Sequence, residues 1–351
     1  MVQLEARVHW IDVLRGIAIL LMIPANLSFL WGESHPLWFR LGASYAAPIF
    51  IMLSTGMLVL NTSKNTLSYA LERGALIIGF GVFMDICVWR TFPFVSFDVL
   101  YIIGIALPII YLAYRFSEKG LIITSIIIFL LTPILQFYIG YHTSVLDIDW
   151  DNKYWPGITR LLQSWFIDGW FPVFPWLGFA VLGAVFFRTV FACSNHCIPK
   201  RIVVFSSFFL IAGFLLLFCQ ADAFKNLSNG GILTERAGYA EIFYPPTLPY
   251  IMTALGMVVI LSKVAQYITR YRLSSIISLF GRFSLLAYFL HQAIAVYIIL
   301  PIVETQGENK ITSGLMFFIC VTSTIIFILF ICFFVEHFKR RKKIIGASFD
   351  K

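Results

Sequence analysis

Charged residues are scarce in this sequence. Asp, Glu, Lys and Arg make up 13% of its 351 residues, about half the share that soluble globular domains carry, which excludes an ordinary soluble enzyme. The sequence also lacks low-complexity stretches and internal repeats, and its 36 Phe, 15 Tyr and 9 Trp exclude a disordered chain. With 60% apolar residues and a mean hydropathy of +0.86, the class that remains is a multi-pass membrane protein.

Cysteine is also sparse and scattered. The chain has six Cys, and their spacing gives no disulfide framework. Four of them lie within apolar runs, where the thiol behaves as a small hydrophobic group: Cys87, Cys219, Cys320 and Cys332. Cys193 and Cys197 flank His196, but a closed zinc site needs a fourth ligand. We therefore expect no metal site.

Long apolar runs recur along the whole chain and predict an all-α fold with about ten transmembrane helices. Each run is long enough, at about 1.5 Å per residue, to cross a hydrocarbon core about 30 Å thick. The runs are 11–31, 43–61, 74–91, 98–114, 120–140, 171–187, 202–219, 247–265, 283–302 and 312–335. The first run is too long for a cleaved signal peptide. We expect one transmembrane domain over residues 1–351.

The basic residues are unevenly divided between the two sets of loops. If the ten runs alternate in direction, the side that holds both termini carries 19 of the 26 Lys and Arg, with a net charge of +13 against −5 on the other side. The positive-inside rule then predicts that both termini are cytoplasmic, together with a basic tail over residues 339–351. The basic residues are spread over many loops, which argues against nucleic acid as a partner.

Some charged residues lie inside the apolar runs, where an unpaired charge costs several kcal/mol. Asp12 and Arg15 share one helix face, so one explanation is an ion pair at the membrane boundary. Asp85 is either a functional group or the buried partner of Arg90 or Arg236. Each of these residues is therefore a candidate for function and for structure alike.

Other polar residues have equally open explanations. Asn26 lies 11 residues after Arg15 in the first run, and is either functional or part of a helix–helix hydrogen bond. Asp98 opens the fourth run, and His291 lies in the middle of the ninth, where a packed, hydrogen-bonded histidine is the simpler explanation. His35 lies just outside the first run.

The longest loops, 141–170 and 220–246, lie on the side opposite the termini. They combine acidic and amide side chains with Trp and Tyr, a composition that suits a polar, ring-shaped ligand such as a sugar. Trp and Tyr also gather at membrane interfaces in general, and this explanation has equal weight.

Several motifs together resemble a known family. Residues 10–26 read WIDVLRGIAILLMIPAN, and residues 35–56 contain H-x-x-W-x-x-L followed by P, F-I-M and G. Further matches are DVLYIIG at 98–104, FPWLG at 174–178, YPP at 244–246 and GRFSL at 281–285. They resemble the heparan-α-glucosaminide N-acetyltransferase catalytic-domain family. The first two motifs are fairly specific to it, and the later ones are shared by a wider superfamily of membrane acyltransferases that includes acyltransferase type 3.

The resemblance implies an acyltransferase with His35 as the catalytic histidine and cytosolic acetyl-CoA, or another acyl-CoA, as the donor. Type 3 acyltransferases place a histidine where this sequence has Asn26, so the sequence departs from their pattern. On this interpretation His35 is a general base or an acyl carrier, and Asn26 stabilises the thioester oxyanion. Asp85 or Asp98 would orient His35 or bind the acceptor.

The remaining expectations combine this resemblance with the predicted topology and loop lengths. The topology places Arg15, Arg73, Arg270, Arg272 and Arg282 on the cytoplasmic side, where their guanidinium groups match the phosphates of CoA. The expected acyl-CoA-binding residues are Arg15, Arg282, Ser284 and Asp12. The expected acceptor-binding residues are Asp98, Arg90 and His291. The expected partners are acyl-CoA, an amino sugar or other glycan, and the lipid bilayer, with a homodimer left open. We expect a bacterial cytoplasmic membrane, although Asn226-Leu227-Ser228 is a glycosylation sequon if the host is eukaryotic.

Two other functions stay open. An O-acyltransferase of cell-envelope polysaccharide would use the same groups with a hydroxyl acceptor. A transporter of a sugar or lipid-linked sugar is compatible with ten helices and buried charges, although the sequence has no inverted repeat of the kind that many transporters carry. Binding of acyl-CoA distinguishes the enzymes from the transporter.

Overall fold

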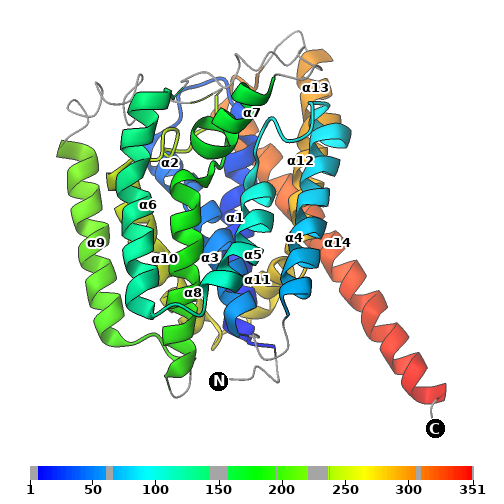
Figure 1. The fold of residues 1–351 in the computed structure, drawn as a ribbon. Coiled ribbons are helices and arrows are strands. Elements are labelled where there is room, and N and C mark those ends of the chain that lie inside the picture. Colours follow the sequence, from blue (N-terminus) through cyan, green and yellow to red (C-terminus); the bar gives the residue numbers. More distant parts are fainter. Residues whose placement is uncertain are drawn as a thin grey trace.

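The computed structural model describes residues 7–60, 66–141, 157–193, 196–219, 236, 238–305 and 310–349. Within these ranges the chain forms helices, loops and two isolated bridges, and no strand, so the all-α prediction is confirmed. The helices form one bundle, and α1 begins at the same end at which α14 ends (Figure 1). We call this the proximal end of the bundle, and the opposite one the distal end.

The helices follow one another along the chain with short connections. They are α1 (His9–Leu27), α2 (Leu37–Ala43), α3 (Ala46–Leu60), α4 (Leu67–Met84), α5 (Val99–Ala113), α6 (Glu118–Ile139), α7 (Ile158–Gln163), α8 (Val173–Ala192), α9 (Lys200–Cys219), α10 (Leu248–Ile268), α11 (Leu273–Arg282), α12 (Ser284–Ile294), α13 (Leu300–Thr305) and α14 (Gly314–Phe349). A 3-10 turn, η1 (Ser28–Leu30), extends α1. Three π-helical segments extend or join other helices: η2 (Asp85–Trp89), η4 (Ser164–Asp168) and η7 (Ala295–Ile299).

Side-chain caps fix where several helices begin. The hydroxyls of Thr66, Ser117 and Thr247 each accept a backbone N–H from the first turn of α4, α6 and α10, groups that have no partner inside the helix. α6 and α10 consequently begin within two residues of the predicted runs. α4 begins seven residues earlier than predicted, because Thr66 caps a first turn that lies outside the apolar run, ahead of the charged residues Glu72 and Arg73.

Eight helical segments in the described residues are long and apolar enough to cross a membrane. They comprise α1 with η1, α2 with α3, α6, α8, α9, α10, α12 through α13, and α14 up to Lys339. α4 and α5 occupy the third and fourth predicted runs but are not among the eight. The count of ten therefore stays a prediction. The segments differ in how many of their residues are buried. Along the apolar stretch of α2 and α3, 83% is buried inside the protein, against 17% along that of α9. α9 therefore presents most of its surface to the surroundings.

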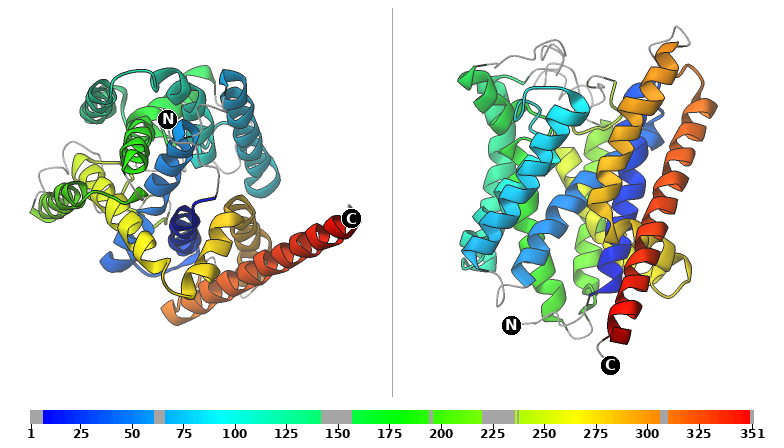
Figure 2. Two further views of the ribbon diagram at one scale, coloured as in Figure 1. Left: turned by 90° about the horizontal axis from the view of Figure 1, so that it is seen from below. Right: turned by 90° about the vertical axis from the view of Figure 1, so that its right-hand side faces the viewer.

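α1 lies inside the bundle and crosses the short helix α11, which the apolar pattern did not predict (Figure 2). The two backbones approach closely at two glycines. A Cβ on Gly16 would lie 2.0 Å from the carbonyl oxygen of Ile277, and one on Gly281 would lie 1.8 Å from that of Asp12. Only glycine leaves room for this crossing, which places the ends of α1 and α11 together at the proximal end.

α14 is the longest helix, and its C-terminal part leaves the bundle (Figures 1 and 2). Its 36 residues correspond to about 54 Å, more than the hydrocarbon core of a bilayer. Phe330, Phe334 and Phe338 are exposed along it. The predicted basic tail over 339–351 begins inside this helix, which continues through Phe349.

Replacing Gly16 with Ala tests the crossing of α1 and α11. Ala normally stabilises a helix interior by about 0.5–1 kcal/mol relative to Gly, but here the methyl group overlaps the Ile277 carbonyl. We expect Gly16→Ala to lower the free energy of unfolding by about 1–3 kcal/mol, measured as a lower Tm in detergent. Gly79→Ala is the matched control, since no atom lies within 4 Å of its added Cβ. Equal Tm values for the two variants would contradict the close crossing.

Candidate active site

A small cavity lies toward the distal end of the bundle. Its volume is about 40 Å³, which is room for about three water-sized groups and not for a whole sugar ring. Most of its wall is apolar and comes from α1, α3 and the loop before α10. The polar residues that line it are Asn26, Asp98, Glu241 and Tyr288.

Asn26, at the end of α1, contacts a buried histidine on α12. His291 Nδ1 donates to the carbonyl oxygen of Ala287 over 2.9 Å, so the lone pair of the neutral ring is on Nε2. Asn26 Nδ2 therefore donates to His291 Nε2 over 3.0 Å. The helix–helix hydrogen bond of Asn26 and the packed histidine are both confirmed. The Asn26 amide has a second N–H, which this bond does not use.

Asp98 joins α5 to α12 at the cavity wall. Its Oδ1 accepts the backbone N–H of Val99 over 2.7 Å and so caps α5. Its Oδ2 accepts the hydroxyl of Tyr288, which lies one helical turn before His291. Asp98 thus contacts α12 one helical turn from His291. Two of the three predicted acceptor-binding residues therefore lie near one another.

Glu241 also lines the cavity; in the sequence it is one of the acids of the loop 220–246 whose composition suits a sugar, and no motif singles it out. It lies in the loop between α9 and α10 and is 3% exposed. Its Oε2 is buried and has no hydrogen-bond partner among the residues that the structure describes. The signal in the sequence was weak: one acid among aromatic residues, three positions before the YPP motif.

Three side chains from the segment between α1 and α3 hold the loop that carries Glu241. Ser28 Oγ accepts the N–H of Ala240 over 2.9 Å, and Ser44 Oγ accepts the N–H of Ile242 over 2.9 Å. Arg40 Nε donates to the carbonyl oxygen of Ala240 over 2.9 Å. The peptide groups on both sides of Glu241 are thereby fixed, which fixes the position from which its side chain reaches the cavity.

His35 is buried beside this loop rather than in the cavity wall. Its Nε2 donates to the carbonyl oxygen of Ser28 over 3.0 Å, so in the neutral ring the lone pair lies on Nδ1. The ring is stacked on Phe39 and makes an edge contact with Trp31. Ser28 thus links His35, through its carbonyl, to the Glu241 loop, through its hydroxyl.

Asp85 accepts hydrogen bonds from the turn that follows α4 and from α5. Its Oδ2 accepts the hydroxyl of Tyr101 over 2.5 Å and the N–H of Phe94 over 3.1 Å, and its Oδ1 accepts the hydroxyl of Ser96 over 2.9 Å. These donors account for a carboxylate that is 2% exposed. The catalytic role predicted for Asp85 stays a prediction.

The two cations predicted as partners of Asp85 lie elsewhere, so that explanation was wrong. Arg90 is exposed, and its guanidinium lies 5.5 Å from the centre of the Tyr297 ring. Arg236 is 1% exposed. It donates to the hydroxyl of Tyr141 and to the carbonyl oxygens of Asp168 and Gly169. Arg236 therefore anchors its loop to the segment before α8.

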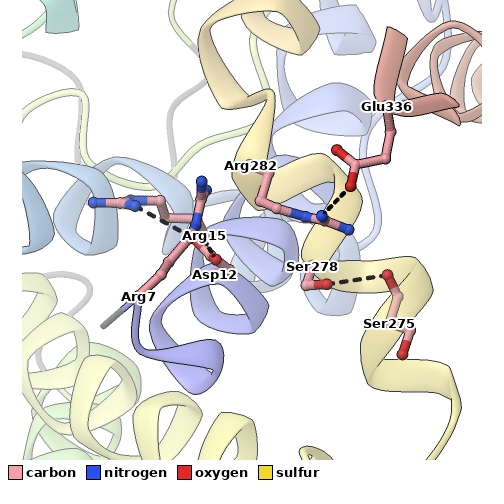
Figure 3. A network of polar contacts seen from close by, with 7 residues as sticks. All are labelled: Arg7, Asp12, Arg15, Ser275, Ser278, Arg282 and Glu336. Carbon is pink, nitrogen blue, oxygen red and sulfur yellow. Dashed lines mark hydrogen bonds and ion pairs between the residues drawn. The ribbon is translucent and has the colours of Figure 1, made fainter. Parts of the chain in front are cut away.

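The predicted donor-binding residues lie at the proximal end (Figure 3). Asp12 pairs with Arg15 over 3.5 Å and with Arg7 over 2.5 Å, so the predicted i, i+3 ion pair is confirmed. Arg282 points toward Glu336 on α14 (Figure 3), with 2.7 Å between their charged atoms. Two of the five arginines predicted to hold phosphates, Arg15 and Arg282, thus already have a carboxylate partner. Ser284 begins α12 two residues after Arg282.

A second hollow, of about 260 Å³, opens at the proximal end beside the start of α1. Trp10 and His196 form part of its wall, and Lys263 and Arg270 of α10 and the turn after it supply two exposed cations. Neither cation has a carboxylate partner within 4 Å among the described residues. Trp10 Nε1 is buried and has no hydrogen-bond partner in that part of the chain. The hollow therefore offers donors and positive charge.

Some expectations fall outside the part of the chain that the structure describes. Asp147, Asp149 and Asp151, and the sequon at 226–228, lie there. Within the described ranges, no group of three or more His, Cys, Asp or Glu is placed to hold a metal ion.

Apolar helices around a buried polar cavity define the class as a multi-pass membrane protein with an internal site. The chain belongs to the family described as heparan-alpha-glucosaminide N-acetyltransferase, catalytic, which residues 7–199 match. This range is more than half of the chain, and it confirms the resemblance of the motifs. It contains Asn26, His35 and Asp98, and ends before Glu241 and His291. No curated protein matches the chain.

The burial of Glu241 should make the free energy of unfolding depend on pH. Burial raises the pKa of the Glu241 carboxyl to about 8, from 4.5. Folding therefore favours the protonated form, and this contribution to stability is lost as the pH rises from about 5 to about 8. We expect Glu241→Gln to gain stability relative to wild type over this interval, by on the order of 3 kcal/mol, measured as the pH dependence of unfolding.

Glu304→Gln is the control for this measurement, because Glu304 is exposed on α13 at the same end of the bundle. Its Tm difference from wild type should stay constant with pH. A constant difference for Glu241→Gln as well would contradict the raised pKa.

Proposed function

We propose that the protein is a membrane acetyltransferase that moves an acetyl group from acyl-CoA to an amino sugar or another glycan acceptor. The observation that carries the proposal is the match of residues 7–199 to a family described as a glucosaminide N-acetyltransferase. The buried polar cavity supports it, since a site inside an apolar bundle keeps water away from a reactive thioester.

The charge asymmetry of the loops supports a cytoplasmic location for both termini. The proximal end then faces the cytosol and the distal cavity lies toward the outer face of a bacterial cytoplasmic membrane. Acyl-CoA is polyanionic and does not cross a bilayer, so it enters at the proximal end. From Trp10 to Asn26, α1 rises by about 24 Å, a distance that the extended pantetheine arm largely spans.

The proximal hollow is the better position for the donor's phosphates. Lys263 and Arg270 border it without carboxylate partners in the described residues, and Trp10 Nε1 is an N–H donor without a partner in that part of the chain. Arg15 and Arg282 lie at the same end, but their ion pairs neutralise much of their charge. We place them, with Asp12 and Ser284, along the path from the hollow into the bundle.

At the distal end, His35 is the proposed catalytic histidine. Because Nε2 donates to Ser28, Nδ1 is the basic nitrogen of the neutral ring, and it would take a proton from the acceptor or attack the acyl carbon. Asn26 would donate its second N–H to the thioester oxygen as negative charge develops there. Asp98, with Arg90 and His291 farther from the cavity, is proposed to bind the acceptor.

The first test compares wild type with His35→Ala. Purified protein in detergent should release free CoA slowly from acetyl-CoA even without acceptor. Loss of a group that transfers protons costs about 10²–10⁴ in rate, so we expect His35→Ala to release CoA at least 100-fold more slowly while its Tm stays within the range of wild type.

His337→Ala is the matched control, because His337 is exposed on α14. A folded His35→Ala variant with wild-type release would contradict the role of His35. If wild type releases no CoA, a binding titration with acetyl-CoA decides the class, and absence of binding would favour the transporter.

The second test concerns the hollow. The double variant Lys263→Ala/Arg270→Ala should raise the KM for acetyl-CoA about tenfold with little change in kcat, because two charge-assisted contacts to phosphate are lost. The difference should shrink at high salt, since exposed charges are screened.

Arg115→Ala/Lys119→Ala removes two exposed cations from the junction of α5 and α6 at the same end of the bundle, and neither residue lines the hollow. It should leave the KM unchanged. A similar rise in both double variants would show that only the general charge of this end matters.

A further inference from the structure

Glu241 is the one polar group lining the distal cavity whose contacts the fold does not explain. Asn26 donates to His291, and Asp98 accepts from Tyr288 and Val99. Glu241, by contrast, has a buried carboxyl oxygen without a partner in the described part of the chain. A buried polar group without a hydrogen bond is costly, and such a group in a native protein commonly serves a ligand.

The charges around the cavity indicate which ligand this is. Two carboxyl groups, those of Asp98 and Glu241, line it, and no Lys or Arg does among the described residues. Arg40 does not line the cavity; its Nε donates to the carbonyl oxygen of Ala240, and its positive charge also acts on the Glu241 carboxyl. A cationic group that entered the cavity would therefore be attracted to both carboxyls, and it would offer N–H donors to the Glu241 oxygen.

Hydrogen bonds on both sides of Glu241 fix its position. Ser28 and Ser44 bind the peptide groups before and after it, and Ser28 also accepts the hydrogen bond of His35. The loop that carries Glu241 lies outside the range that matches the family, so the family assignment says nothing of this residue. The cavity itself admits a small group and excludes a ring.

We propose that Glu241 binds the ammonium group of an amine acceptor and takes the first proton that the acceptor loses. The proposal rests on the function proposed above, and it selects an amine over a hydroxyl. Burial favours the protonated Glu241 carboxyl in the empty site, whereas an ammonium in contact with it favours the carboxylate, so binding of the ammonium releases the Glu241 proton to water. The bound ammonium then gives one of its own protons to the carboxylate and becomes a neutral amine with a lone pair. The nitrogen then forms a C–N bond to the acyl carbon while the C–S bond breaks, and the second proton from nitrogen ends on the sulfur of CoA. Glu241 returns its proton to water.

The test uses glucosamine and glucose, which differ at one position by an ammonium group in place of a hydroxyl. Ligand-induced stabilisation at pH 7, without acetyl-CoA, measures binding to wild type, Glu241→Gln and the exposed control Glu304→Gln. We expect glucosamine to stabilise wild type and the control, with glucose weaker. In Glu241→Gln the affinity for glucosamine should fall at least tenfold, as expected for loss of a charge-assisted hydrogen bond.

Transfer to glucosamine then gives a second readout. Glu241→Gln should raise the KM for glucosamine at least tenfold and lower kcat, while the KM for acetyl-CoA stays at the wild-type value. Glucosamine that binds wild type and Glu241→Gln equally, or does not bind wild type at all, would overturn the assignment of Glu241. Glu241-dependent binding of glucosamine in a protein that ignores acetyl-CoA would support Glu241 and overturn the transferase instead.

Discussion

The candidate site depends on one constraint: backbone groups of a loop that enters the apolar bundle must find partners there. Water is excluded from this region, so the peptide groups around Glu241 are satisfied by side chains from the segment between α1 and α3. Ser28 and Ser44 accept its N–H groups, and Arg40 donates to a carbonyl. This bonding closes the cavity on one side, brings an acid to it, and ties it to His35 through Ser28.

Charge is used differently at the two ends of the molecule. At the proximal end, Asp12 and Glu336 neutralise arginines and hold α1 and α14 in place, while Lys263 and Arg270 border a hollow without such partners in the described chain. At the distal end, the cavity carries carboxyls and no cation in that part of the structure. A polyanionic donor and a cationic acceptor are thus complementary to opposite ends.

Much of the architecture could be predicted from the sequence, because a long apolar run has few alternatives to a helix in a membrane. The same reasoning located Asn26, Asp98 and His291, since polar residues in such runs stand out.

The reasoning from apolar runs missed α11, whose apolar residues follow one face of a short helix and form no continuous run. Glu241 was included only as one of the acids of the loop 220–246 and was not singled out, because the burial of Glu241 results from hydrogen bonds to residues about 200 positions away, and no local pattern records these. The partners of Asp85 were wrong for a related reason: hydroxyl and backbone donors replaced the expected arginine.

The three π-helical segments, η2, η4 and η7, all lie toward the distal end of the bundle. A π turn holds more residues than an α turn, so each can accommodate a change of one residue in the length of the chain. Insertion or deletion at these points rotates the downstream residues by about 100° and leaves the preceding helix unmoved. η7 lies directly after α12, so Tyr288 and His291 keep their positions while α13 turns. The rim of the site can therefore diverge between relatives, by single-residue length changes, without disturbing the polar groups beneath it.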